Sequence, residues 1–402
     1  MNNLIEAYPS KNHFQRLILA AALSNKHFII NNYPRSTDAI VIIKALKELG
    51  YSIYEYENYI EINSQLRKFK IEYFIDCKDS GFAIRVLPLI FMNENSKFHF
   101  YFDTRILDRN IDEIFTIFNN LDIKYQIKNN LLEYKGNLAA KDLEINGSIS
   151  SQFITGLLYN ISFNKYNYKL LTKNTSSKGY VEYTLKILEQ FGKNFLYINN
   201  VLKLEKNSEI LSYNLEVDGD WSGAAFFIIL GLILGNLGIK GLRINSGQPD
   251  EIIYHFLKSL NYNIDFKNDI LIINKCNLKG FSFDANHNPD LVPPLVILAL
   301  FSNKESIIYN VGRLKYKESN RILELVNGIK QLNGNINYKD GNLYISKSNL
   351  SYKQITYAND HRIIMTFAII QKILTKEYIE PNYYVNKSNP LFFNQLNSLY
   401  YE

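Results

Sequence analysis

A unit that repeats along the chain is the feature of this sequence that most constrains its fold. Each copy contains an amphipathic helix, a short break, and two strands joined by a polar turn. The breaks fall roughly 70 residues apart, at Gly50, Asp122, Gly192, Asn261 and Gly334. Gly and Asn, which fill four of these five breaks, are favoured where helices end. Such regular spacing is improbable by chance and predicts an α/β protein built from repeated units.

The repeat helices are expected at residues 38–49, 111–121, 181–191, 252–260 and 321–333. Dipeptides typical of hairpin turns separate several of the strands that follow, for example Asn199 with Asn200 and Asp340 with Gly341. A sixth copy is incomplete, because residues 391–399 have a helical pattern and no strands follow them. We expect residues 3–7 to complete this last unit, so that the N-terminus returns to the C-terminal half of a closed, pseudo-symmetric protein.

The composition narrows the class of protein. The chain has 402 residues, 47% of them hydrophobic, which is enough for two domains. Its net charge of +6 is compatible with anionic substrates and does not require nucleic acid. The histidines lack metal-site spacing, and Cys77 and Cys276 suggest no disulfide framework, which fits a cytoplasmic protein. Residues 1–9 do not resemble a signal peptide, and the longest apolar runs, 224–234 and 291–301, are too short to span a bilayer.

Cationic residues at expected helix starts indicate anion binding. The stretch from Lys315 to Ile322 places three cations and one carboxylate before an amphipathic helix, with Ser319 as the expected N-cap. Lys11 and Arg16 bracket the start of another helical run, residues 17–23. Each piece alone is equally explained as a solvated basic surface. The recurrence of such pieces along the whole chain favours a site for anions.

Two further pieces belong to the same class. Gly81 lies in a strand-to-helix turn, and Arg85 follows it, so this turn can offer backbone N–H groups to an anion. Arg105 and Arg109 are four residues apart and can share one helical face. Taken singly, each arginine is as easily a surface residue.

Polar helix starts complete the set. Ser150, Ser151 and Gln152 open an apolar helix, where hydroxyls and free backbone amides can hold a phosphate. Ser177 occupies the equivalent place before the next repeat helix. Asp290 precedes an apolar helix and is either a simple cap or a base placed over a substrate hydroxyl.

Together these motifs resemble the EPSP synthase family of enolpyruvyltransferases, along essentially the whole chain and in order. The most specific matches are Gly147-Ser-Ile-Ser-Ser-Gln-Phe153, Ser177-Lys-Gly-Tyr180, Asn286-His-Asn-Pro-Asp290, Lys317-Glu-Ser-Asn-Arg321 and Asn359-Asp-His-Arg362. The resemblance implies a two-domain, pseudo-symmetric inside-out α/β barrel built from six βαβαββ repeats. One domain would span residues 11–217 and the other residues 1–10 with 218–402, with the active site in the cleft between them.

The resemblance also implies a reaction. Members of the family transfer the enolpyruvyl group of phosphoenolpyruvate to the 5-hydroxyl of shikimate 3-phosphate by addition and elimination, and they release phosphate. The reaction belongs to the shikimate pathway, which leads to chorismate and the aromatic amino acids. No metal or organic cofactor is implied. We expect a cytoplasmic monomer whose only partners are these two substrates, with no nucleic acid and no membrane.

Site roles are carried over by resemblance, position by position. The expected contacts to shikimate 3-phosphate are Lys11, Asn12, Arg16, Ser150, Ser151, Gln152, Ser177, Tyr180, Asp290 and Lys317. The expected contacts to phosphoenolpyruvate are Lys11, Gly81, Arg109, Gln152, Arg321, Arg362 and Lys387. Asp290 would take the 5-hydroxyl proton, Lys317 and Glu318 would handle the proton of the transferred group, and Lys11 would lie between the substrates.

The chain departs from the family pattern at several positions. Asn12 replaces a serine, Gly179 a proline and Asn320 an aspartate, and Asp79 to Phe82 stand where the family has Asn-Ala-Gly-Thr. A carboxylate near phosphoenolpyruvate is repulsive unless Lys78 or Arg85 neutralises it. We therefore expect reduced but real activity and altered sensitivity to inhibitors that mimic phosphoenolpyruvate.

Three other functions remain open at this point. A related enolpyruvyltransferase acting on a UDP-sugar would carry a reactive cysteine in a mobile loop, whereas Cys77 and Cys276 lie in strand-like contexts. A nucleic-acid-binding protein would need a basic stripe with exposed aromatic residues. A weakly active or non-catalytic relative would keep the substrate contacts, and the change at Asp79 leaves this alternative open.

Overall fold

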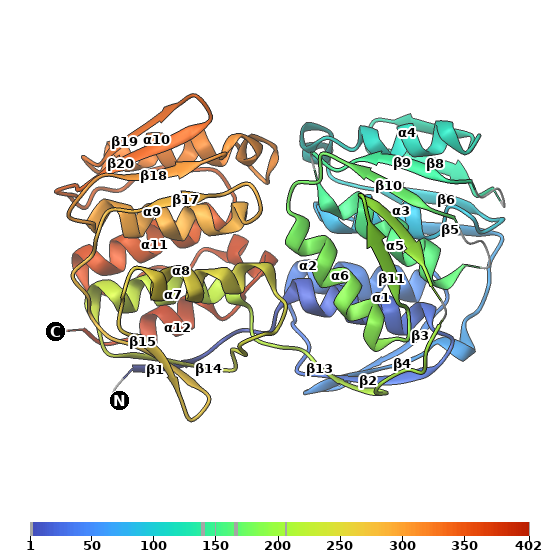
Figure 1. The fold of residues 1–402 in the computed structure, drawn as a ribbon, viewed down its shortest axis with the longest axis horizontal. Coiled ribbons are helices and arrows are strands. Elements are labelled where there is room, and N and C mark those ends of the chain that lie inside the picture. Colours follow the sequence, from blue (N-terminus) through green and yellow to red (C-terminus); the bar gives the residue numbers. More distant parts are fainter. Residues whose placement is uncertain (1–2, 138–140, 149, 165–167, 206, 402) are drawn as a thin grey trace. The chain divides into compact units, whose positions relative to one another are not determined.

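The computed structural model describes residues 3–137, 141–148, 150–164, 168–205 and 207–401 (Figure 1). The chain divides into two compact units, which are described one at a time below. The first unit is Lys11–Val217, and the second combines Met1–Ser10 with Asp218–Glu402. Ile149, which belongs to one of the quoted sequence motifs, lies outside the described residues.

Among the described residues, the first unit has three four-stranded sheets, in the orders β13-β2-β4-β3, β5-β6-β8-β7 and β11-β12-β10-β9. The strands are β2 (His27–Asn31), β3 (Ser52–Glu55), β4 (Tyr59–Asn63), β5 (Glu72–Asp76), β6 (Lys97–Tyr101), β7 (Tyr125–Lys128), β8 (Leu131–Lys135), β9 (Leu143–Asn146), β10 (Leu170–Lys173), β11 (Phe195–Ile198), β12 (Val201–Leu204) and β13 (Asn214–Glu216). Each sheet has one parallel pair, β13 with β2, β5 with β6 and β9 with β10, and the other pairs are antiparallel.

Six α-helices accompany these sheets: α1 (Lys11–Leu23), α2 (Thr37–Glu48), α3 (Gly81–Ile90), α4 (Asp112–Asn120), α5 (Ser151–Phe163) and α6 (Lys178–Gln190). Helices α1, α3 and α5 are buried along almost their whole length, so they form the centre of the unit. Helices α2, α4 and α6 bury one face only, as expected for amphipathic repeat helices.

The second unit has the same plan, with two four-stranded sheets in the orders β1-β14-β16-β15 and β17-β18-β20-β19 among the described residues. Their strands are β1 (Asn3–Glu6), β14 (Leu237–Lys240), β15 (Ile264–Lys267), β16 (Ile270–Ile273), β17 (Ser282–Asp284), β18 (Ser306–Tyr309), β19 (Asn335–Lys339) and β20 (Asn342–Ser346). The helices are α7 (Trp221–Leu234), α8 (Ile252–Ser259), α9 (Val292–Phe301), α10 (Arg321–Gln331), α11 (His361–Thr375) and α12 (Phe392–Ser398). Helices α7, α9 and α11 pack against one another as the buried centre.

Short 3₁₀ helices join several of these elements. They are η1 (Ser64–Leu66), η2 (Thr104–Arg109), η3 (Pro249–Glu251), η4 (Pro289–Leu291), η5 (Gly312–Tyr316) and η6 (Tyr383–Lys387). Three of them, η2, η4 and η6, carry residues that the sequence assigns to the site.

The backbone confirms the predicted hairpin turns. Asn199 and Asn200 both have positive φ, at 51° and 63°, and so do Asp340 and Gly341, at 50° and 80°. This is the geometry of a type I′ hairpin turn, which Asn, Asp and Gly adopt most easily. Each of the five predicted repeats therefore contains its helix and its pair of antiparallel strands, and the α/β fold class is confirmed. The sheets are open, however, and none of those described closes into a barrel.

The N-terminal strand joins the C-terminal half of the chain, as predicted, but not the predicted repeat. Strand β1 pairs in parallel with β14, residue Asn3 opposite Leu237 and Glu6 opposite Lys240, so it completes the fourth repeat and not the last one. In the described part of residues 347–401, helices α11 and α12 are present and no strand is assigned. In four of the five sheets the outer parallel strand precedes its partner in the chain, whereas β13 follows β2, so chain order alone does not give the partner of such a strand.

Two helix starts also differ from the sequence-based expectation. Helix α1 begins at Lys11, six residues before the predicted apolar run at 17, so Lys11 and Arg16 are both helical. Helix α10 begins at Arg321, and its N-cap is Asn320, whose side chain accepts a hydrogen bond from the backbone N–H of Leu323. Ser319, the expected cap, instead donates its hydroxyl to Asp360.

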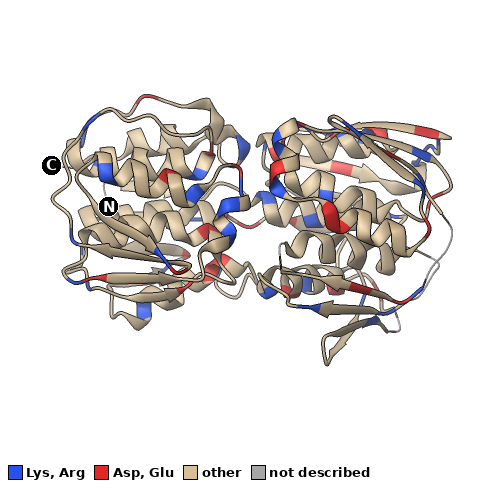
Figure 2. Ribbon diagram, turned by 90° about the horizontal axis from the view of Figure 1, so that it is seen from above, with Lys and Arg blue, Asp and Glu red and all other residues tan. Residues whose placement is uncertain are grey.

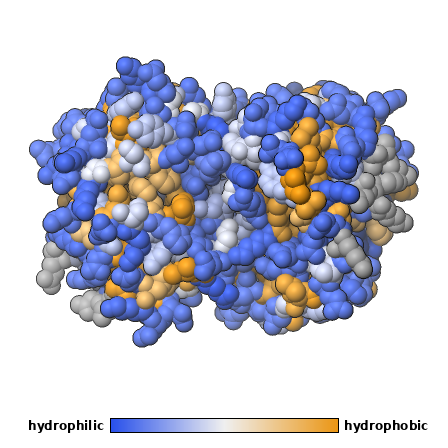
Figure 3. Space-filling model, in the orientation of Figure 1, coloured by the Kyte–Doolittle hydropathy of each residue, from blue (hydrophilic) through white to orange (hydrophobic). Residues whose placement is uncertain are grey.

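Charged residues of both signs are interspersed over each unit, without a single basic stripe on the described residues (Figure 2). In each unit, the face visible in Figure 3 is mostly hydrophilic and is interrupted by separate apolar patches. None of the described helices is long and apolar enough to cross a membrane.

Candidate active site

The candidate site of the second unit lies where the N-termini of its central helices meet. The guanidinium of Arg362, at the start of α11, contacts the backbone oxygen of Ser222 in α7 at 3.5 Å. The same guanidinium donates to the backbone oxygen of Asp290 in η4, directly before α9, at 3.1 Å. Three helix N-termini are therefore directed at one place, which favours negative charge there.

Three cations surround the side chain of Asp290, which is 19% exposed. Its Oδ1 lies 2.9 Å from Nη1 of Arg321 and 3.4 Å from Nζ of Lys317. Its Oδ2 lies 3.3 Å from Nη2 of Arg362. Asp290 is thus held at the centre of a cationic cluster, and it does not cap a helix through its side chain.

The charges in this cluster shift one another's pKa values. Burial alone would raise the pKa of Asp290, but Arg362, Lys317 and Arg321 together lower it well below its usual value. Burial lowers the pKa of Lys317, and Asp290 opposes this effect. Asp290 is therefore ionised at neutral pH, and the Lys317 ammonium releases its proton more readily than an exposed lysine does.

Arg321 is fixed by two further carboxylates. Its Nε donates to Asp360 at 2.8 Å, and its Nη2 donates to Glu318 at 2.6 Å. Asp360 is fully buried and also caps α11 by accepting the backbone N–H of Arg362. Despite the opposing effect of burial, these carboxylates raise the pKa of Arg321. The arginine that binds Asp290 through Nη1 is consequently also bound by two carboxylates at its other nitrogens.

A buried carboxylate that sequence reasoning missed lies behind this cluster. Asp250, in η3, accepts hydrogen bonds from the hydroxyl of Ser222 and from the amide of Asn288. Burial, followed by the nearby charge of Asp290, raises the pKa of Asp250. Asp250 therefore connects α7 to the segment before η4 and helps to place Asp290.

Glu318, Asp360 and His361 bring ligand atoms within 4.8 Å of one another and are the one such group found among the described residues. Both carboxylates, however, already bond to the guanidinium of Arg321. The arginine supplies the positive charge that a metal ion would bring.

Arg16 organises the candidate site of the first unit. It is 2% exposed, and its Nε donates to the hydroxyl of Thr184 in α6, which lies 3.3 Å from the hydroxyl of Thr155 in α5. Its guanidinium lies 5.6 Å from the ring centroids of both Phe82 and Tyr180. Helices α1, α3, α5 and α6 thus meet near their N-terminal halves around one buried cation, and burial lowers the pKa of that cation.

A second chain of contacts joins the predicted phosphoenolpyruvate residues of this unit. Arg85 donates to the side-chain oxygen of Gln152 at 3.0 Å and also to the backbone oxygen of Arg109. Arg109 in turn donates to the backbone oxygen of Asp79 at 3.1 Å. A Cβ atom on Gly81 would lie 2.6 Å from Nη2 of Arg109, so glycine is required for this close approach. From the sequence, Arg85 was considered only as a neighbour of the turn and as a possible counter-charge for Asp79, and its positioning role was missed.

The predicted phosphate cradle lies at two helix starts. Ser150 caps α5 by accepting the backbone N–H of Gln152 at 3.2 Å, and Ser151 is the buried first residue of that helix. Ser177 precedes α6 with a left-handed backbone, φ 52°, which is uncommon for serine and strained. Helices α5 and α6 pack together, which brings these hydroxyls to one end of the helix pair.

The remaining predicted residues lie at the edges of these groups. The ammonium of Lys11 lies 2.7 Å from Asp38, a partner that the sequence did not indicate, and Asn12 accepts from Arg16 through its backbone oxygen. Lys387 is buried at the end of η6, which packs against α11. The structure therefore gathers Asp290, Lys317, Glu318, Arg321 and Arg362 in one unit, and it links Arg16 with Tyr180 and Gln152 with Arg109 in the other.

One expectation about the first unit was wrong. Arg105 and Arg109 do not share a face, because both lie in η2, where Arg105 is exposed and bonds to Asp103 while Arg109 is buried. The ammonium of Lys78 bonds to Asp76 at 2.6 Å. The guanidinium of Arg105 lies 3.9 Å from the Asp79 carboxylate.

Comparison with known proteins identifies the family. A sequence model of EPSP synthase (3-phosphoshikimate 1-carboxyvinyltransferase) matches residues 1–396. The chain belongs to the EPSP synthase family. The 3-phosphoshikimate 1-carboxyvinyltransferase of Clostridium novyi is 32% identical over 98% of this chain and 94% of its own length. That of Clostridium acetobutylicum is also 32% identical, over 98% and 94%.

Solved structures share the fold of this family member. EPSP synthase from Acinetobacter baumannii superposes with a TM-score of 0.73 at 18% identity and covers 93% of this chain and 89% of its own. The enolpyruvyl transferase NikO from Streptomyces tendae reaches a TM-score of 0.75 at 11% identity, covering 98% and 94%. The predicted family and fold class are confirmed.

Proposed function

We propose that this family member transfers the enolpyruvyl group of phosphoenolpyruvate to the 5-hydroxyl of shikimate 3-phosphate and releases phosphate, as a step of aromatic amino-acid biosynthesis. The observation that carries this proposal is Asp290, an ionised carboxylate held by three cations at the start of a buried helix. Such a group can take a proton from a hydroxyl, and the cations around it can bind an anionic partner.

The first unit supplies the groups that bind shikimate 3-phosphate. The hydroxyls of Ser150, Ser151 and Ser177 and the free N–H groups of α5 and α6 suit its phosphate. Arg16 and Tyr180 contact each other and are placed to bind the rest of the same substrate. Remaining contacts are assigned to Asn12 and Gln152.

Phosphoenolpyruvate binding is assigned to cations of both units. In the first unit these are Lys11 and Arg109, with Gly81 leaving room for the guanidinium. In the second they are Arg321, Arg362 and Lys387. A bound phosphoenolpyruvate would compete with Asp290 for Arg321 and Arg362, because its phosphate and carboxylate are also anionic.

This competition has a chemical consequence. When Arg321 and Arg362 turn to the substrate, the pKa of Asp290 rises toward its ordinary value, and the carboxylate becomes a better base for the 5-hydroxyl proton. The Lys317 ammonium, whose pKa is lowered by burial, can donate the proton that C3 of phosphoenolpyruvate receives. Glu318 is the second proton-handling group.

The addition and elimination steps then balance without a cofactor. The 5-hydroxyl oxygen bonds to C2 while C3 gains a proton, and phosphate leaves C2 of the tetrahedral adduct as C3 loses a proton again. The chain's own acids and bases supply each transfer. We further propose that the protein acts as a cytoplasmic monomer and that both units contribute to a single site.

The test is phosphate release from purified protein given both substrates. We expect release only when both are present, and a loss of roughly 10² to 10⁴-fold in the Asp290→Asn variant, which keeps the shape but not the base. Asp265→Asn, at a half-exposed carboxylate of the same unit, is the matched control and should keep full activity.

Other outcomes separate the alternatives. Tight binding of shikimate 3-phosphate without phosphate release would indicate a non-catalytic relative whose phosphoenolpyruvate contacts are impaired near Asp79. Release with a UDP-sugar acceptor in place of shikimate 3-phosphate would indicate the related enolpyruvyltransferase. Absence of both binding and release would refute the proposal.

A further inference from the structure

The second unit, which contains the Asp290 site, also has a cavity. This cavity lies at the opposite ends of two of the helices that form the Asp290 site. Its volume is about 1140 Å³. Leu234, the last residue of α7, lines it, and so does Lys372 in the last turn of α11. Helix α7 has 14 residues, which separates its two ends by roughly 20 Å. This cavity is therefore distinct from the candidate active site.

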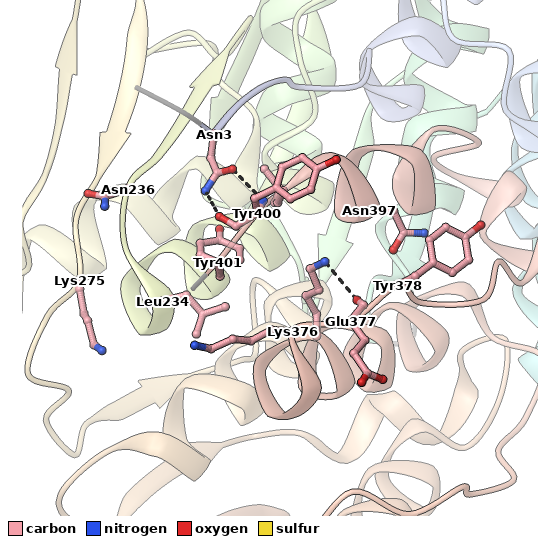
Figure 4. A pocket seen from close by; sticks show the side chains of 12 residues that line it. Asn3, Leu234, Asn236, Lys275, Lys376, Glu377, Tyr378, Asn397, Tyr400 and Tyr401 are labelled. Carbon is pink, nitrogen blue, oxygen red and sulfur yellow. Dashed lines mark hydrogen bonds between the residues drawn. The ribbon is translucent and has the colours of Figure 1, made fainter.

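The lining of this cavity is cationic. Lys275, Lys372 and Lys376 contribute three ammonium groups, and Glu377 contributes the one carboxylate among the lining residues. Figure 4 shows the side chains of Lys275 and Lys376 extending toward the same side of the cavity. The net positive charge favours a ligand that carries about two negative charges.

One of these lysines is buried, which is costly for a residue of this type. Lys372 is 3% exposed, and burial lowers its pKa. Its Nζ donates to the backbone oxygen of Glu377 at 3.1 Å, an interaction marked in Figure 4. Ordinary capping of a helix C-terminus explains this bond. It does not explain why Lys275, from the loop after β16, is brought to the same cavity.

The rest of the lining is suited to an organic body. It consists of amides, phenols and aliphatic side chains: Asn3, Asn236, Asn397, Tyr378, Tyr400, Tyr401, Leu234 and Leu399. Asn3 both donates to and accepts from the backbone of Tyr400 at 2.9 Å, so the wall formed by the two ends of the chain is fixed (Figure 4). Phenol rings and leucines pack against a ring, while amides bond to its polar substituents.

We propose that this cavity binds a small organic anion, a phosphate ester or dicarboxylate that carries a ring. The lysines bind its charged groups, and the tyrosines and leucines of the lining contact its ring. The proposal does not depend on the reaction assigned to the Asp290 site. It predicts that occupation of the cavity leaves the substrate-binding residues unobstructed.

The test is titration calorimetry of the full chain with phenyl phosphate and with inorganic phosphate, in the presence of saturating shikimate 3-phosphate. We expect phenyl phosphate to bind at one site and more tightly than inorganic phosphate. The double variant Lys275→Ala/Lys376→Ala should weaken this binding roughly tenfold or more, because two charged contacts are lost. Both lysines are exposed, so the variant should remain folded.

A matched control removes the same charge elsewhere in the unit. Lys330→Ala/Lys353→Ala alters two exposed lysines that do not line the cavity, and it should bind phenyl phosphate like the unaltered protein. Equal weakening in both double variants would show only a general charge effect and would overturn the proposal. Equal affinity for the two ligands would refute the organic part of the proposal, and lack of binding by either would refute all of it.

Discussion

At the scale of single residues, the candidate site depends on charges that neutralise one another. Asp290 is stabilised by three cations, and Arg321 is stabilised by Asp290, Glu318 and Asp360. Anionic substrates can enter such a cluster by exchanging partners with its carboxylates, so no cation has to be stripped of all its contacts. Buried charges of this kind are strongly coupled, and removal of one leaves the others uncompensated.

The acid dependence of stability should reveal this coupling. The folded pKa of Asp290 is depressed, so its ionised form contributes stability that is fully present above its unfolded pKa, near 3.9, and is lost as pH falls toward the folded value. We predict that Asp290→Asn lowers the free energy of unfolding at pH 7 and that this difference shrinks between about pH 5 and 3. Urea unfolding at several pH values measures it, and a difference that stays constant or grows on acidification would contradict the prediction.

Adding a single methyl group at Gly81 tests the role assigned to Arg109. The Cβ atom of Gly81→Ala would displace the flexible guanidinium of Arg109 and no backbone atom, so stability should change little. If Arg109 binds phosphoenolpyruvate, the KM for that substrate should rise roughly tenfold, as for loss of a charged hydrogen bond, while affinity for shikimate 3-phosphate stays unchanged. Gly312→Ala, whose added Cβ would meet no atom within 4 Å, is the control. An unchanged KM in Gly81→Ala would argue against the role assigned to Arg109.

At the scale of elements, helix N-termini are where this chain places its chemistry. In the second unit, α7, α9 and α11 begin at the Asp290 cluster, and α10 begins beside it with Arg321. In the first unit, α5 and α6 begin with the serines assigned to the phosphate. The caps of these helices therefore matter both for folding and for the position of the site.

The cap of α10 can be tested directly. Asn320→Ala removes the acceptor for the backbone N–H of Leu323, and we predict a loss of about 1 kcal/mol in the free energy of unfolding. Asn320→Asp keeps the acceptor and adds a charge that the helix dipole favours, so it should be neutral or stabilising. Thermal or urea unfolding of the two variants measures the effect. Equal destabilisation by both would show that the side chain of Asn320 acts in some other way.

Sequence reasoning succeeded where the signal is local. The period of the apolar residues and the Gly and Asn breaks predicted the repeat helices and hairpins, because both depend on residues close in the chain. It failed on the partner of β1, since pairing between strands more than 230 residues apart leaves no local pattern. It also predicted Ser319 and not Asn320 as the N-cap of α10, because serine and asparagine are both favoured at N-caps and the sequence does not distinguish two such neighbours.

The site was predicted in the same uneven way. The residues of the Asp290 cluster were named from motifs, and the structure brings them together. The residues that support the two candidate sites were missed: Asp250 behind Asp290, Thr184 bonded to Arg16 and Asp38 bonded to Lys11. Each is an ordinary residue in its own segment and gains its role from a tertiary contact. Different surroundings also make Arg105 exposed and Arg109 buried, although the two are of the same type and four residues apart.

At the scale of the whole molecule, the two units differ in how the chain builds them. The first unit is one continuous segment, Lys11–Val217, and its β13 returns to pair with β2. The second unit is discontinuous, because β1 from the N-terminus pairs with β14. The side chain of Asn3 is also bonded to the backbone of Tyr400 near the other end of the chain.

Fragments should show this difference. We predict that residues 11–217 fold alone, whereas residues 218–402 remain poorly folded until a peptide of residues 1–10 is added. The fragment 218–402 lacks both the strand that pairs with β14 and the buried side chain of Ile5, and the peptide supplies them. Circular dichroism and hydrogen exchange of the fragments measure this. Cooperative unfolding of fragment 218–402 without the peptide would contradict the prediction, and a peptide with Ile5→Asp is the control that should not rescue it.

The pairing of β1 with β14 also orders events on the ribosome. Residues 3–6 are translated before their partner strand, residues 237–240, so β1 must wait until more than 230 further residues have been made. At about 5–20 residues per second this delay is roughly ten seconds to a minute. During that time Lys11–Val217 can fold while a short strand with an unsatisfied edge stays free beside it. Strand β1 is thus translated long before it can pair, and nascent chains are expected to be most vulnerable to misassociation in this interval.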